Sequence, residues 1–131
     1  MSDVVSIKGQ AFPALVAVTA QEQERGLMFQ KWPPPIMVFP YQREGYHKFW
    51  MHNTPSPLDI IFAKGNSVIG IFKGEPLSTK LIGPDQPSDL VIELPAGTAS
   101  DLGLSVGDYV SFAPTKETLA KLVRNASIFF R

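Results

Sequence analysis

The chain has 131 residues, 44% of them hydrophobic and 18% charged, so it is long enough for one domain that buries a core. Twelve basic side chains balance twelve acidic ones, and without an excess positive field nucleic acid is not an expected partner. The lack of cysteine excludes disulfides, thiolate nucleophiles and cysteine-bound metals.

The first residues show no targeting signal. The segment Met1–Ser6 lacks a basic start followed by a long apolar run, so we expect no signal peptide in this chain and, by default, a cytoplasmic location. The wholly apolar runs are only a few residues long, far short of the ~20 residues that a spanning helix needs. The sequence therefore predicts no membrane span.

The N-terminal part predicts a strand followed by a short helix. Leu15–Val18 has the apolar, β-branched character of a strand. Thr19 is a suitable N-cap, with Glu22 at the capping-box position three residues later, and Gly26 is where the helix should stop. We expect the residues that follow, Leu27–Phe29, to plug the core.

A proline-rich segment separates this helix from the next strand. Trp32–Pro35 carries three consecutive prolines, which lack amide donors and favour an extended polyproline path. Ile36–Phe39 then predicts a strand that Pro40 ends. We expect a loop over Tyr41–Gly45, leading into an extended Tyr46–Met51.

The middle of the chain predicts strands joined by a tight turn. Leu58–Phe62 is strongly apolar, Lys64–Ser67 supplies hairpin-turn residues, and Val68–Phe72 returns as a second strand. Leu90–Leu94 predicts a further strand. Its alternation places Glu93 opposite its apolar neighbours, so an exposed carboxylate is the default expectation.

The C-terminal part predicts a helical turn, a last strand and a final helix. Thr98 is a candidate cap for a turn before Gly103, and Tyr109–Ala113 reads as the last strand. Thr115 should cap a final helix with apolar residues on one face. The whole chain, 1–131, is therefore predicted to be a single mainly β domain (β-rich α+β). We expect a small barrel or rolled antiparallel or mixed sheet with two or three short helices, and a C-terminal helical extension over 114–131.

Three ordered motifs together resemble the domain-of-unknown-function family 192, over about residues 12–113. The resemblance implies a small β-barrel-like domain, common in bacteria and archaea and often exported, but no activity, because the function of that family is not established. This chain departs from the family in lacking an export signal, and in having His52 where a lysine or similar residue is usual. The motifs are Glu24–Phe29; Phe49–Pro55 with Pro57–Phe62; and Glu93–Thr98 with Leu102–Leu104 and Val106–Asp108.

The aromatic segment Phe49–Pro55 contains the first candidate ligand-binding residues. In an extended chain, Trp50 and His52 share one face, so they could form with Asn53 a platform for a planar or sugar-like ligand. The structural alternative is that Trp50 plugs one end of the barrel while Asn53 begins a turn.

Asp59 and Arg25 complete the candidate set. Asp59 interrupts an apolar strand, so its carboxylate must be paired, hydrogen-bonded or solvent-facing. It could contact a ligand or act as a base near His52. Alternatively it could accept backbone amides of the Asn53–Ser56 turn, or pair with Arg25, which the helix dipole already favours at a helix C-terminus.

Standard catalytic and metal-binding signatures fail. The two histidines, His47 and His52, do not have helical zinc-ligand spacing, and neither a nucleophile elbow nor a phosphate-binding loop is present. We therefore expect neither a metal site nor a cofactor. Three functions stay open: a non-catalytic module that binds a small molecule or a protein in a groove near Trp50–Asn53, an assembly component that forms homo-oligomers through residues 115–131, and a small hydrolase using Asp59 and His52.

Overall fold

Seven strands form one mixed sheet in the computed structural model, which describes residues 2–128. Three short helices accompany the sheet, and the mainly β prediction is therefore confirmed. The strands are β1 (Asp3–Ile7), β2 (Gln10–Val16), β3 (Met37–Gly45), β4 (Leu58–Lys64), β5 (Ser67–Gly74), β6 (Ser88–Pro95) and β7 (Val110–Ala113); the helices are α1 (Ala20–Arg25), α2 (Thr98–Asp101) and α3 (Lys116–Ile128).

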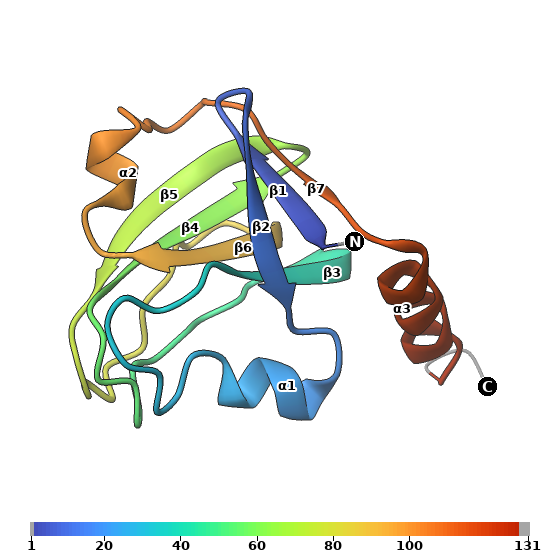
Figure 1. Ribbon diagram of the computed structural model, residues 1–131, viewed down its shortest axis with the longest axis horizontal. Coiled ribbons are helices and arrows are strands. Elements are labelled where there is room, and N and C mark those ends of the chain that lie inside the picture. Colours follow the sequence, from blue (N-terminus) through green and yellow to red (C-terminus); the bar gives the residue numbers. More distant parts are fainter. Residues whose placement is uncertain (1, 129–131) are drawn as a thin grey trace.

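The sheet is strongly rolled but does not close into a barrel (Figure 1). Its strand order is β5-β4-β6-β3-β2-β1-β7, antiparallel throughout except for the parallel pair β2–β3. The two edge strands approach each other through an isolated bridge between Ser67 and Tyr109. A backbone hydrogen bond from Val68 N to Asp108 O, 2.9 Å long, reinforces that approach. The rolled sheet thus has an inner and an outer face.

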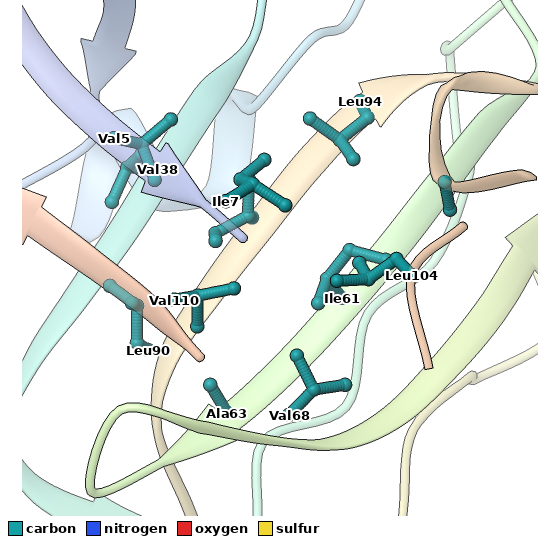
Figure 2. Close-up of a cluster of buried hydrophobic side chains, with 12 residues drawn as sticks. Val5, Ile7, Val38, Ile61, Ala63, Val68, Leu90, Leu94, Leu104 and Val110 are labelled. Carbon is teal, nitrogen blue, oxygen red and sulfur yellow. The ribbon is translucent and has the colours of Figure 1, made fainter. Parts of the chain in front are cut away.

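The inner face holds the first of two hydrophobic cores. Alternate residues of the central strands point inward, among them Ile61 of β4 and Ile92 of β6, and they meet Val5 and Ile7 of β1 (Figure 2). Leu104, which follows α2, covers one end of this core. The strand β1 was not predicted from the sequence, although Val5 and Ile7 are fully buried.

The outer face is also covered, and this fact decides where a site can form. Phe39 of β3, Ile60 and Phe62 of β4 and Val91 of β6 point outward into a second core. This core is completed by side chains from irregular segments, chiefly Leu27 after α1 and Met51. Both faces of the central strands are therefore buried, as is typical of strands at the centre of a covered sheet.

Several local predictions are confirmed. Thr19 caps α1 in a full capping box with Glu22, and Gly26 is the C-cap residue. The hairpin between β4 and β5 turns at Gly65 and Asn66, both with positive φ.

Other local predictions are wrong. Pro40 does not end its strand: β3 runs on through the expected Tyr41–Gly45 loop, and a register shift after Pro40 accommodates the missing amide donor. Phe29 does not plug the core, because it is 63% exposed. The segment 46–51 forms only an isolated bridge, between Phe49 and Ile82, and its path is otherwise irregular.

The helix α3 lies at the side of the sheet in Figure 1 and is tied to it by polar contacts. Thr115 Oγ1 accepts the Thr118 amide at 3.1 Å, which confirms the predicted cap. Asp3 of β1 accepts the Thr115 amide at 2.7 Å, and Lys121 forms an ion pair with Glu22 of α1. Burial raises the pKa of Glu22, but Lys121 and the backbone amides of the cap outweigh it and hold this pKa at about 2.

Candidate functional site

A pocket of about 220 Å³ opens between the end of α1, the outer face of the sheet and the aromatic segment. We call it the outer pocket. It is smaller than the ~300–1,000 Å³ clefts that hold drug-sized ligands, so it suits a single ring or a short chain. All three sequence motifs contribute to its wall, which is formed by Gln23, Glu24, Arg25, Gly26, Leu27, Met28, Phe39, Tyr41, His47, Lys48, Phe49, Trp50, His52, Thr54 and Glu93.

Glu93 of β6 lies in this wall with only 4% of its surface exposed. The expectation of an exposed Glu93 is therefore wrong. The alternation itself is right, because Ile92 and Leu94 point to the inner core while Glu93 points outward. The error lies in treating the outward face as exposed to solvent, whereas Leu27, which follows α1, and the aromatic segment cover it.

The Glu93 carboxyl group has no partner of its own. Its Oε1 is buried and unpaired, and no hydrogen bond or ion pair to the Glu93 side chain is found in the part of the chain that the structure describes. Burial raises the pKa of Glu93 to about 8, so the group is mostly protonated at neutral pH. A buried polar group without a partner is rare in a folded protein, and it calls for an explanation.

Tyr41 and His47 form the side of the outer pocket next to Glu93. Their rings stack at 3.5 Å between centroids, with an angle of 14° between their planes. Burial, with the nearby Glu93 charge, raises the pKa of Tyr41 well above its ordinary value. Burial lowers the pKa of His47, and its Nε2 has no hydrogen-bond partner among the described residues. At neutral pH this side therefore supplies polar atoms and no net charge.

Aromatic rings form much of the remaining wall. Phe49 packs edge-on against Phe39, with centroids 4.9 Å apart. Trp50 is 42% exposed and lies beside His52, at 4.8 Å between ring centroids. Trp50 therefore does not plug one end of a barrel, and its partly exposed ring lines the outer pocket instead. Of the five candidate residues, Trp50, His52 and Arg25 line the outer pocket, whereas Asn53 and Asp59 do not.

Gly26 brings the C-terminal end of α1 next to Glu93. It ends the helix at φ 49° and ψ −129°, a conformation that side chains disfavour. A Cβ atom added there would stand 3.6 Å from Glu93 Oε1 and 3.6 Å from Phe39 Cζ. Glycine therefore both terminates the helix and leaves the space over the carboxyl group open.

Asp59 does not belong to the outer pocket. Its Oδ2 accepts the amides of Gly97 and Ala99, at 3.0 and 2.9 Å, so it caps the start of α2 from a neighbouring strand. This corrects two expectations. The amides are not those of the Asn53–Ser56 turn, and Thr98 is not the cap, because its hydroxyl donates to Pro95 O instead.

Asn53 also has a structural role. It takes a positive φ of 54°, which asparagine tolerates better than most residues, and its carbonyl accepts the Phe29 amide at 2.8 Å. It is not part of the outer-pocket wall, although its neighbours His52 and Thr54 are. Over the described range, no group of three or more His, Asp or Glu side chains is arranged to hold a metal ion.

Comparisons with known proteins agree with the predicted resemblance. The model of the DUF192 family, described as an uncharacterized ACR, matches residues 3–112, so the likeness begins earlier than residue 12 and includes β1. No curated protein matches. Within residues 2–128, no helix is both long and apolar enough to cross a membrane.

Two solved structures share the fold. A protein of unknown function from Novosphingobium aromaticivorans DSM 12444 is 32% identical with a TM-score of 0.74, over 83% of this chain and 82% of its own. A "putative transcription regulator" from Sinorhizobium meliloti 1021 is 29% identical, also with a TM-score of 0.74, over 85% of this chain and 94% of its own.

Proposed function

This chain belongs to the DUF192 family, and we propose that it is a binding module that holds a small organic molecule in the outer pocket. The observation that carries the proposal is Glu93, a buried carboxyl group that faces the pocket without a partner. Leaving such a group unpaired costs the folded protein stability. A ligand that hydrogen-bonds to it offsets this cost in the bound state.

The aromatic rings support the same function. Trp50 is half-open to solvent and could stack on an entering molecule, while the stacked Tyr41 and His47 form a rigid side wall. Few polar groups converge on an otherwise apolar and aromatic pocket, which is the usual composition of a small-molecule site. Arg25 at the end of α1 supplies a cation near the entrance.

The test is a binding screen read by amide NMR shifts, with single-ring compounds of neutral, anionic and cationic type. We expect hits that shift the signals of Trp50 and Glu93 and that weaken at least tenfold in Trp50→Ala. A matched control is Lys73→Ala, which alters a separate groove of about 460 Å³ beside α2. If no compound of any type shifts the outer-pocket signals, the proposal is wrong.

The hydrolase hypothesis loses its proposed base. Asp59 Oδ2 is occupied by two backbone amides, and the residue is 6% exposed. His52 remains at the pocket entrance, but the pairing of His52 with Asp59 that defined this hypothesis has no support from these contacts.

Assembly through the C-terminal extension remains a prediction. The side chains of Leu119 and Val123 are exposed on α3, while polar contacts fix the start of the helix. The terminal Phe129 and Phe130, which belong to the expected extension over 114–131, lie outside the described residues. The transcription-related description belongs to the Sinorhizobium protein, and for this chain the balanced charge argues against a nucleic-acid partner.

A further inference from the structure

We infer that the ligand of the outer pocket is a small organic cation, a primary amine or guanidine, whose N–H groups bind the Glu93 carboxylate between the aromatic walls. This inference rests on the proposed binding function and specifies its ligand class. Three features of the described pocket support it: the unpaired Glu93 carboxyl group, the aromatic rings of the wall, and the space beside Gly26.

The Glu93 carboxyl group has no counter-charge in the described pocket wall. Glu93 is the only acidic side chain that is buried in the pocket wall, since Glu24 is exposed. The two cations in the wall do not neutralise it. Lys48 donates instead to Gly83 O, Pro84 O and the Asp85 carboxylate. Arg25 lies over the ring of Phe29 at 5.9 Å.

The surface of the pocket around Glu93 is largely aromatic. Phe39, Tyr41, Phe49 and Trp50 present aromatic rings to one small pocket. Ring faces attract cations through the negative face of their quadrupole, and the attraction grows when the cation is desolvated. An anionic ligand would meet the same faces and a carboxyl group together, which disfavours it. A neutral ligand would satisfy the carboxyl group and could stack on the rings, but it would not gain the cation–π attraction.

The space beside Glu93 fits such a group. Gly26 places no side chain over the carboxyl group, where a Cβ atom would stand 3.6 Å from Glu93 Oε1. A volume of about 220 Å³ admits a ring with a short aminomethyl arm. An ammonium group there could donate to the carboxylate and remain against the Tyr41–His47 stack.

Such binding is coupled to proton release. Because burial raises the pKa of Glu93 to about 8, the carboxyl group is about nine-tenths protonated at pH 7 and must ionise to pair with a cation. The apparent affinity follows the ionised fraction, so it rises about tenfold from pH 6 to pH 7 and levels off above pH 8. The other titratable or charged groups of the wall are Glu24, Arg25, Tyr41, His47, Lys48 and His52.

The experiment is calorimetric titration of the full chain with three matched probes: benzylamine, benzyl alcohol and benzoate. We expect benzylamine to bind at least tenfold more tightly than the other two. Repeating the titration in two buffers of different ionisation enthalpy should show release of about 0.9 proton at pH 7. In Glu93→Gln we expect benzylamine binding to weaken at least tenfold at pH 8 and its proton release to vanish.

Failure of the inference is distinct from failure of the binding function. Equal or tighter binding of the alcohol or the acid in the outer pocket would overturn the cation and leave a binding module. Benzylamine binding without proton release would overturn the role of Glu93, and this readout needs no variant. His52→Gln is the control for a histidine origin of the proton: release that persists in it supports Glu93, and release that disappears contradicts it.

Discussion

The substitution Glu93→Gln, which removes the ionisable group, should stabilise the free protein and reduce the pH dependence of its free energy of unfolding. A carboxyl group with a pKa of 4.5 in the unfolded chain and about 8 in the folded one holds its proton longer in the folded state. Between these values the unfolded state binds fewer protons, so the free energy of unfolding falls as pH rises, by about 1.4 kcal/mol per pH unit. From pH 5 to pH 7 the loss amounts to about 3 kcal/mol.

The assay is urea unfolding of the wild type and of Glu93→Gln at several pH values from 5 to 8. We expect the stability difference between them to grow in favour of the variant as pH rises. His47, whose pKa burial lowers, has the opposite effect: below about pH 6.5 it makes the free energy of unfolding rise with pH, and it does so equally in both proteins. Glu75→Gln, at an exposed position, is the control. A pH dependence of stability that is unchanged in Glu93→Gln would refute the reasoning.

Three further predictions concern the scaffold. Asp59→Ala should cost about 2 kcal/mol in urea unfolding because it leaves the amides of Gly97 and Ala99 without their acceptor, the second of them buried, while ligand affinity stays the same. A large affinity loss with intact stability would contradict the capping role. Glu22→Gln keeps the capping box but removes the ion pair with Lys121, so it should cost less than ~1 kcal/mol, whereas Glu22→Ala should cost about 1 kcal/mol more. Light scattering should show a larger particle for the full chain than for one ending at Ala113 if the extension drives assembly, and equal monomers would exclude it.

Local patterns predicted most of the framework because the forces that set it act over a few residues. The capping box at Thr19 and the hairpin turn at Gly65 depend on side chains three or fewer positions apart. The strand after Pro40 could not be predicted in this way. A proline inside a strand is tolerated only where the partner strand shifts register, and that shift is a property of the β3–β6 pair.

The candidate site was predicted only in part. The aromatic segment indicated Trp50 and His52 as candidate residues, and both line the outer pocket, but Glu93 in the same wall was missed. Glu93 has the same alternation as any half-exposed strand residue, and its burial follows from Leu27 and the aromatic segment packing over the outer face. One signal in the sequence could have indicated Glu93. It is the first residue of the third motif shared with the family, and a glutamate that only contacts solvent would not be expected to belong to such a motif. Asp59 was recognised as anomalous, but its partners lie ~40 positions away in α2.

The most direct measurement is an NMR titration of the side-chain carboxyl carbon of Glu93 in the free protein and with benzylamine bound. Our account predicts a titration near pH 8 in the free protein, caused by burial without a partner, and a much lower midpoint in the complex. A free-protein midpoint near the ordinary value of 4.5 would contradict it, because Glu93 would then already have water or a protein partner and no need of a ligand.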